Sequence, residues 1–341
     1  MDAKALKFEF QRLRFFALSK NNYFCRLINE FMKKGILYAL LASVLWSIVS
    51  PFIKQGISYD FAAINFAGMR FTLVGVILMI YTAHRGMFEQ VRRNWRLFVL
   101  LILLNIFMGY VTFYMGVDRV SGDISSIVMG LTPLINVVLA HLLIQSDRLT
   151  RGKVFSLGVS LVGLLLIVGM GSEGNPLDAR GFLGVGLLLA SILLQGYSAI
   201  LVSGHRGNIH GEVDPVFLNA VQMLFGGVMI YLTGVATEGF HPFWNKPMGF
   251  YLSLGVLVFI SVFAFSFWFI ALRQGDTKVS DVNMCRSVHP IIGAVASWIL
   301  MPDEHPQFST VAGMLLIFAS LWLYFKGEAI GRGVQKLLRG K

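Results

Sequence analysis

Charged residues are scarce in this chain of 341 residues: only 14% are Asp, Glu, Lys or Arg, whereas 56% are hydrophobic. A soluble domain has about a quarter of its residues charged, so the sequence lacks the polar surface that a water-soluble fold needs. The hydrophobic residues also gather in runs of about 20, the length at which a helix crosses a bilayer. The composition therefore predicts an all-α membrane protein and excludes a soluble globular domain.

Cysteine is nearly absent, and no enzyme signature is present. Cys25 lies in a basic stretch and Cys285 in a hydrophobic run, so the two set no disulfide framework. The chain has no G-x-x-x-x-G-K-[ST] loop, no H-E-x-x-H motif and no Cys/His cluster at metal-ligand spacing. We therefore expect no enzymatic activity, no cofactor and no metal site.

Carboxylates are missing from the interior of the hydrophobic runs. All 18 Asp and Glu residues fall in connections, tails or run ends, with Asp123 and Asp281 nearest to membrane depth. A pathway for organic cations needs a negative group, and proton antiporters commonly use a buried carboxylate. The sequence thus disfavours proton-coupled export of cationic drugs and favours a substrate that bears a carboxylate.

Ten hydrophobic runs are long enough to be membrane spans, and no hydrophilic domain is inserted between them. Their approximate ranges are 35–53, 61–82, 97–116, 123–145, 154–170, 181–203, 215–236, 250–271, 281–301 and 308–325. The fold class expected from them is an all-α protein with ten transmembrane helices.

Lys and Arg are distributed unevenly around these runs. Of the 29 such residues, 23 lie in the two termini and every second connection, including the basic tail at 327–341, and four lie in the other connections. The remaining two, Arg70 and Arg286, fall inside predicted spans. Because cytoplasmic loops retain Lys and Arg, this pattern predicts both termini in the cytoplasm. The same distribution explains the net charge of +11: the positive residues orient the chain in the membrane and are attracted to anionic lipid headgroups, so the charge does not indicate nucleic-acid binding.

Residues 1–31 form a separate basic extension. The segment FEFQRLRFFALSK at 8–20 alternates aromatic and basic residues, a pattern compatible with a surface helix on the inner leaflet. Alternatively, translation starts at Met32, directly before Lys33, Lys34 and the first hydrophobic run. The sequence leaves both alternatives open.

The two halves of the chain repeat one another. LLASVLW at 40–46 returns as LLASILL at 188–194, and further matches keep a similar offset. The repeats, 32–175 and 176–326, contain five predicted spans each, so the second enters the membrane from the opposite side. Inverted repeats of this kind are characteristic of alternating-access transporters, whose substrate site lies near the midplane between the halves.

The segments GILYALLASVLWSIVSPFIKQG, INFAGMRFTLVGVIL and TPLINVVLAHLLIQSDRLTRGKVFSLGVSLVGLLLIVG resemble the EamA-like branch of the drug/metabolite transporter superfamily, over residues 32–326. The resemblance implies two inverted five-helix repeats and transport of small metabolites, often outward from bacteria. Trp46 matches the tryptophan of the family's first-helix pattern, and Arg70 matches the arginine of its second-helix pattern. Ser47 stands where the family usually has glycine, and Leu194 replaces the second-half tryptophan.

Polar residues inside the runs define a predicted substrate pathway, because a polar side chain in hydrocarbon must be paired or face a cavity. The candidates are Trp46, Ser47, Ser50, Arg70, Asn105, Asn136, Gln195, Ser198, Asn283, Arg286 and His289, with helix breaks at Pro51, Pro133 and Pro290. The alternative for the serine and glycine stripes is that they only allow helices to approach closely and hydrogen-bond one another.

The two arginines inside the runs need partners. An arginine near the bilayer centre, as Arg70 is by count, costs about 2.5–3.5 kcal/mol on insertion scales. Its expected partners are carbonyls freed at a broken helix or a substrate carboxylate. Arg286 shares a helix face with Asn283 and His289, and Pro290 frees the Arg286 carbonyl. We expect this cluster to line a polar cavity; the alternative is that Arg286 extends to the headgroups.

Together these features predict a secondary transporter that exports amino-acid-like or small anionic compounds across the bacterial cytoplasmic (inner) membrane by alternating access. Its expected partners are a small-molecule substrate and the lipid bilayer, and a homodimer is left open. Two alternatives stay open as well: an uncoupled facilitator of the same fold, and a non-transporting accessory or sensory membrane protein.

Overall fold

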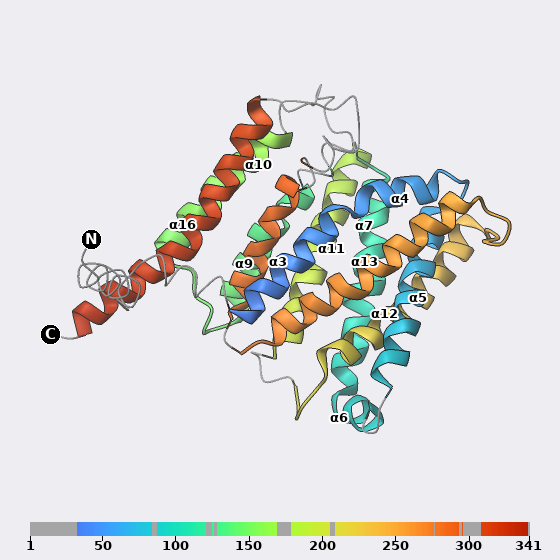
Figure 1. Ribbon diagram of the computed structural model, residues 1–341, viewed down its shortest axis with the longest axis horizontal. Helices are drawn as coiled ribbons and strands as arrows, with labels where there is room; N and C mark the ends of the chain where they lie inside the picture. Colours follow the sequence, from blue (N-terminus) through green and yellow to red (C-terminus); the bar gives the residue numbers. More distant parts are fainter. Residues whose placement is uncertain are drawn as a thin grey trace, which may run out of the picture.

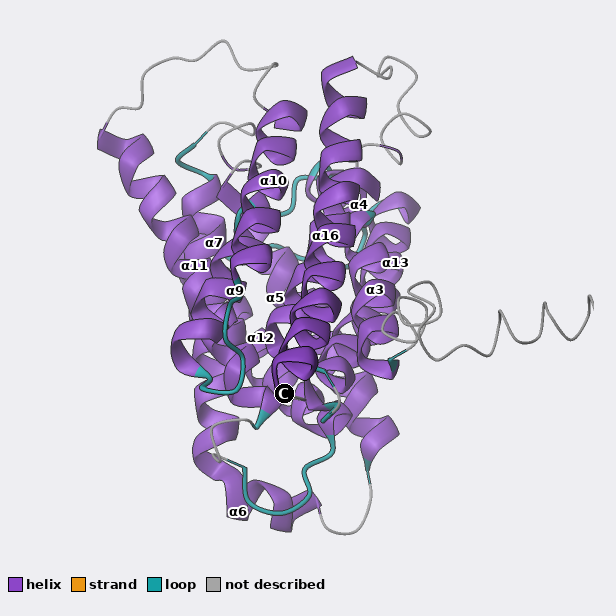
Figure 2. Ribbon diagram, turned by 90° about the vertical axis from the view of Figure 1, so that its left-hand side faces the viewer, coloured by secondary structure: helices purple, strands orange, loops and turns teal. Residues whose placement is uncertain are grey.

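The computed structural model describes residues 33–83, 87–120, 125, 128–168, 179–204, 209–275, 277–292, 295 and 308–339. Within these ranges, the side chains at 50, 51, 54, 167–168, 309–310 and 326–339 lie outside the description. The extension at 1–31 lies outside it as well. The described part is helical apart from its connections, so the predicted all-α class is confirmed (Figures 1 and 2).

The hydrophobic runs form helices because a helix satisfies every backbone polar group internally, as lipid requires. The elements are α3 (Lys34–Ser47), α4 (Val49–Ile57), α5 (Ala63–Thr82), α6 (Met87–Leu100), the π-helix η1 (Leu101–Met108), α7 (Gly109–Val117), α9 (Thr132–Leu143), α10 (Arg151–Val168), α11 (Ala179–Ser203), α12 (Pro215–Glu238), α13 (Met248–Arg273), α14 (Val279–Met284), the 3-10 helix η2 (Cys285–Val288) and α16 (Phe308–Arg339).

Five helical stretches in the described part are long and apolar enough to cross a membrane. They are Ala63–Thr82, Met87–Val117, Ala179–Ser203, Pro215–Glu238 and Met248–Arg273. Shorter apolar helices cover Lys34–Ser47, Thr132–Leu143 and Val311–Phe325. The helix that contains the run expected at 97–116 begins at Met87, but Asn94 leaves the helical conformation three residues before that run, and from there α6 continues into η1 and α7 without a gap.

Three of the runs are interrupted rather than continuous. The first breaks at Ile48, between α3 and α4 and three residues before Pro51. The fourth breaks at Leu131, and Pro133 lies in the first turn of α9, where its missing amide costs nothing. In the ninth, α14 tightens into η2 directly before the helical stretch that contains Pro290.

The helices α5 and α12, which are equivalent in the two repeats, run antiparallel. A methyl group added at Gly68 would meet the Tyr231 backbone, and one at Gly75 would meet the Leu224 backbone. Moving seven residues forward on α5 thus moves seven residues back on α12. Small residues let the two backbones touch. Equivalent helices of opposite direction are what an inverted repeat requires.

The remaining contacts obey the same symmetry. The helix α3 packs on α13 and its counterpart α11 packs on α7, whereas α9 packs on α14 and α10 on α16. Exchanging the two halves leaves this set of pairs unchanged. In Figure 1 the α10–α16 pair lies to one side of the other helices.

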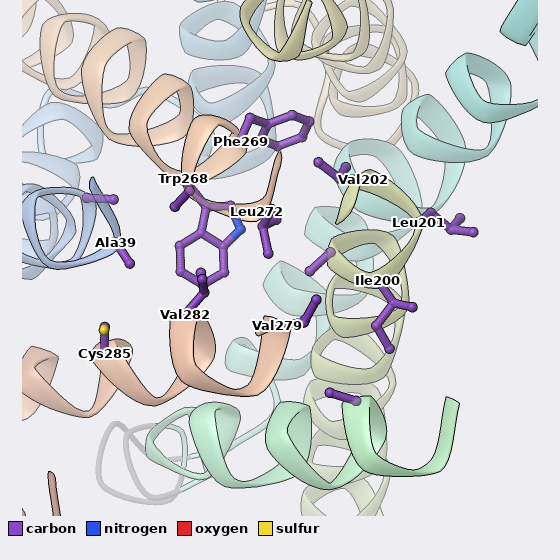
Figure 3. Close-up of a cluster of buried hydrophobic side chains, with 14 of the residues drawn as sticks. Ala39, Ile200, Leu201, Val202, Trp268, Phe269, Leu272, Val279, Val282 and Cys285 are labelled. Carbon is purple, nitrogen blue, oxygen red and sulfur yellow. The ribbon is translucent and has the colours of Figure 1, made fainter. Parts of the chain in front are cut away.

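A core of buried hydrophobic side chains lies where α3, α11, α13 and α14 meet. Trp268 of α13 extends toward Val282 of α14, and Leu272 lies near Val279 (Figure 3). Cys285 is buried in the same cluster as a free thiol. The polar groups described next lie beside this core.

Candidate functional site

The guanidinium of Arg286 lies against two neighbouring tryptophan rings. Its Cζ is 5.3 Å from the ring centroid of Trp46 and 5.3 Å from that of Trp268, and the two rings are 5.4 Å apart. A cation over an indole face is attracted by the ring quadrupole. The end of α3, the C-terminal part of α13 and η2 therefore meet at this charge, and the alternative of an arginine extended to the headgroups does not account for these contacts.

His289 adds an imidazole to the same cluster. Its ring stands edge-on to Trp46 at a centroid distance of 6.2 Å. Its Nε2 is buried and has no hydrogen-bond partner among the described residues. Arg286, His289 and Trp46 all keep partial exposure although residues of other helices surround them. The cluster thus offers unsatisfied polar capacity next to accessible space.

Aromatic rings extend the cluster across the molecule. Phe265 contacts Trp46 at 5.0 Å between ring centroids and Phe71 at 6.1 Å, and Phe71 contacts Tyr110 at 4.5 Å. The chain of rings leads from η2 to α5, where the second predicted arginine lies.

Arg70 is 5% exposed, and its Nε donates a hydrogen bond of 2.8 Å to the Ser261 hydroxyl. That hydroxyl in turn donates to the Leu257 carbonyl at 2.7 Å. The guanidinium also lies 5.2 Å from the Phe71 ring centroid. The sequence had pointed to a freed carbonyl or a substrate carboxylate as partner; the contact in the structure is instead a serine of α13.

Amides form a second polar group between η1 and α12. Asn105 Nδ2 donates to Gln222 Oε1 at 2.9 Å, and Gln222 Nε2 donates to Asn219 Oδ1 at 3.0 Å. The Asn219 amide nitrogen is buried without a partner in the described part. Gln222 and Asn219 were missed by the pathway prediction, although Asn219 is the repeat counterpart of Asn65.

Gln195 joins α11 to α7 through one serine. Its Nε2 donates to Ser191 Oγ at 3.0 Å, and Ser191 Oγ donates to the Gly109 carbonyl at 2.8 Å. Gly109 follows the π-helix, whose wide turn is a frequent feature of functional sites.

Asn136 and Asn283 join the two halves directly. Asn136 Nδ2 donates to Asn283 Oδ1 at 2.9 Å, and Asn136 Oδ1 is buried without a described partner. The pair lies beside the interruptions at Pro133 and Pro290, so the bond links the two broken helices, α9 and α14.

Two predicted serines satisfy themselves within their own helices. Ser47 Oγ donates to the Ser43 carbonyl at 2.7 Å, and Ser198 Oγ donates to the Leu194 carbonyl at 2.8 Å. This fits the packing alternative for the serine stripes. The side chains of Ser50 and Pro51 lie outside the described residues.

The electrostatics of the site are one-sided. Among the residues that the structure describes, no carboxylate lies within 4.0 Å of Arg70 or Arg286. Buried charges are stable when paired. The two arginines therefore lie among hydroxyl and aromatic groups, with no counter-charge from the described residues.

Known proteins share this architecture. The chain is 26% identical to the uncharacterized transporter YvbV of Bacillus subtilis, over 85% of this chain and 91% of that one. It is 23% identical to a protein of Chlamydia trachomatis named S-adenosylmethionine/S-adenosylhomocysteine transporter, over 80% and 83% of the two chains. A solved crystal structure superposes with a TM-score of 0.70 at 16% identity, covering 85% of this chain and 95% of that chain.

Comparison with family models identifies the family of this sequence. The model of the EamA-like transporter family matches residues 33–169 and again residues 182–326, once in each half. The resemblance seen in the first-half segments is thereby confirmed for both halves. The chain belongs to the EamA-like transporter family, and it is a multi-pass membrane transporter rather than an enzyme.

Proposed function

We propose that this transporter exports amino-acid-like or small anionic metabolites across the bacterial inner membrane by alternating access. The observation that carries the proposal is the Arg286 guanidinium, held over Trp46 and Trp268 and without a described carboxylate within ion-pair distance. A substrate carboxylate at this point would neutralise the charge in a medium of low dielectric, where the attraction is strong.

The size and chemistry of the surrounding groups support a small zwitterion or anion. Guanidinium pairs with carboxylate in bidentate geometry, the aromatic faces suit an apolar or planar side chain, and the Asn105–Gln222 pair offers donors and acceptors. The relative from Chlamydia trachomatis is named for S-adenosylmethionine, whose methionine part carries a carboxylate beside an ammonium. That precedent agrees with an amino-acid-like substrate.

The broken helices supply the points at which the halves can move. The interruptions at Ile48 and η2 adjoin Trp46 and Arg286, and the Asn136–Asn283 bond bridges the halves one turn beyond the interruption at Leu131. Alternating access in inverted repeats is a rocking of one half against the other around a fixed site. The moving units proposed are 32–175 and 176–326.

The orientation proposed for the protein places both termini in the cytoplasm. Its support is the charge distribution, with 23 of 29 Lys and Arg residues on one side of the predicted spans. The extension at 1–31 and the tail at 327–341 then lie on the cytoplasmic side.

Counterflow into proteoliposomes tests the transport proposal. Vesicles loaded with a candidate amino acid or organic acid should take up the labelled compound, and a matched amine without a carboxylate should not be taken up. Repeating the assay with and without a pH gradient separates a proton-coupled transporter from an uncoupled facilitator. Absence of counterflow for every carboxylate tested would favour the accessory or sensory alternative.

Metabolite profiling tests the direction. Cells that overexpress the protein should accumulate the substrate in the medium and lose it from the cytosol. An opposite gradient would make the protein an importer.

A further inference from the structure

A cavity lined by apolar and basic side chains lies where α6 meets the end of α11 and the segment before α12. Its volume is about 450 Å³, and its walls include Arg93, Trp95, Arg96, Leu100 and His210. The α6 helix lies at the lower end of the molecule in Figures 1 and 2. A volume of this size is in the range of small-ligand pockets.

The cavity lies at the boundary of the membrane-spanning part of its helix. The three arginines of α6 precede Leu97, where the apolar part of the stretch Met87–Val117 begins. Trp95 is 55% exposed and Leu100 is 39% exposed. Tryptophan is enriched at the headgroup level of membranes, so one end of the cavity faces water and the other faces lipid tails.

A built-in bend shapes the wall. Asn94 leaves the helical conformation (φ −121°, ψ 25°), and its amide binds the connecting segment at two points. Asn94 Nδ2 donates to the His210 carbonyl at 3.0 Å, and the His210 amide donates to Asn94 Oδ1 at 2.8 Å. Gly211, with a φ of +73°, brings its backbone against the Arg93 guanidinium, where a side chain would collide. The two halves are thus fastened together around the cavity.

The charge in the cavity is unbalanced. Among the described residues, no carboxylate lies within 4.0 Å of Arg93 or Arg96, and the contact of the Arg96 guanidinium is the Trp95 ring, 5.5 Å away at its centroid. Arg92 is the neighbour of Arg93 in sequence but is not part of the cavity wall. Guanidinium binds phosphate oxygens in a bidentate arrangement.

We propose that this cavity binds a phosphate-bearing anion, and that its source is the headgroup of an anionic phospholipid. Arg93 and Arg96 hold the phosphate, His210 and the Asn94-anchored backbone border it, and the acyl chains follow the exposed apolar side of α6 past Leu100. The site joins a first-half helix to a second-half connection, so a bound lipid stabilises one relative position of the halves. Basic pockets between membrane helices are known to bind such headgroups.

Native mass spectrometry of the full chain in detergent tests the site. The probes are phosphatidylglycerol, phosphatidylcholine and inorganic phosphate, each added separately. Phosphatidylglycerol should be retained in preference to phosphatidylcholine. Arg93→Gln and Arg96→Gln should each weaken phosphatidylglycerol binding about fivefold, since each removes a charge-assisted hydrogen-bond donor that borders the phosphate. The matched control, Arg92→Gln, removes the same charge one residue away and should change binding less than twofold.

Each other outcome overturns the proposal. Equal weakening by Arg92→Gln would mean diffuse surface attraction rather than a site, and equal retention of phosphatidylcholine would mean that no anion is recognised. Binding of inorganic phosphate without a preference for phosphatidylglycerol would assign the cavity to a free anion. A second readout is independent of retention in the mass spectrometer: the part of the tryptophan quenching by brominated phosphatidylglycerol that is lost in Trp95→Phe should decrease in the Arg93 and Arg96 variants.

Discussion

Lys153 and Arg286 are both cations inside the helix bundle, but their surroundings are opposite. Lys153 is fully buried, and its Nζ lies 2.9 Å from Asp281 Oδ1, 3.4 Å from Ser280 Oγ and 4.4 Å from the Tyr324 ring centroid. Arg286 is partly exposed and contacts tryptophan rings instead of a described carboxylate.

The difference separates a charge with a carboxylate partner from the charge proposed to bind substrate. The network around Lys153 extends to Asp147, which accepts hydrogen bonds from Ser280, 2.8 Å from the amide and 2.5 Å from the hydroxyl, and it ties the first repeat to the second. Arg286 has no carboxylate within ion-pair distance among the described residues, so in the proposed function a substrate carboxylate is its counter-ion.

Breaking the ion pair should give the largest effect. Lys153→Met leaves the Asp281 carboxylate buried and unpaired, which costs about 3–5 kcal/mol of folding stability. Thermal unfolding in detergent measures it. The double variant Lys153→Met with Asp281→Leu should recover most of the loss, because it removes both charges. If Lys153→Met were as stable as the wild type, the ion pair with Asp281 would not stabilise the fold, and Lys153 would not differ from Arg286 in this respect.

Replacing Arg286 should separate transport from stability. Arg286→Ala should lower transport of a carboxylate substrate about 30-fold (~2 kcal/mol), as expected when one partner of a buried charge pair is truncated. Thermal stability should stay equal or rise, since an unpaired buried charge is lost. Arg286→Lys keeps the charge but not the planar stacking group, so its transport rate should lie between those of the wild type and Arg286→Ala. Unchanged counterflow in Arg286→Ala would contradict the site.

Arg70 is intermediate between the two cases, because its partner is a neutral hydroxyl. Ser261→Ala removes the acceptor of the 2.8 Å bond from Arg70 Nε and should cost about 1–2 kcal/mol of stability. Denaturation curves of this variant and of Ser253→Ala, a serine of the same helix that bonds only its own backbone, provide the measurement. Equal losses would show that Arg70 gains nothing from Ser261.

The smallest effect should come from a pair at the surface. Asp118 lies 3.3 Å from Arg180, with both side chains more than half exposed. Asp118→Asn should change stability by less than about 0.5 kcal/mol, because exposed ion pairs contribute little. Addition of salt should leave the difference from the wild type within error. A larger loss would mean that the solvent exposure of an ion pair does not indicate how much it contributes to folding stability.

Much of the fold could be predicted from the sequence because the bilayer leaves few choices. Apolar length dictates a helix, and an odd number of spans per repeat dictates opposite insertion, as the antiparallel α5 and α12 confirm. The helices are interrupted within a few residues of Pro51, Pro133 and Pro290, as predicted, because proline removes a backbone amide donor.

The side-chain partners could not be predicted in the same way. Lys153 was counted with a cytoplasmic connection, but it lies within α10 and pairs with a residue 128 positions away. Trp268 and Ser261 were missed as partners of the two arginines. Such pairs depend on the rotation of each helix about its axis, which packing decides. An available signal was Trp268, a tryptophan near the end of the apolar run at 250–271.

The backbone contact between α5 and α12 limits where a substrate can travel. Gly227 and Gly234 of α12 also lie against the α5 backbone, as Gly68 and Gly75 lie against α12. Main chains that touch at four levels leave no room for a solute between α5 and α12. In the alternating access proposed above, the substrate would therefore pass elsewhere, beside the interrupted helices, and the glycine contact would act as the pivot between the two halves.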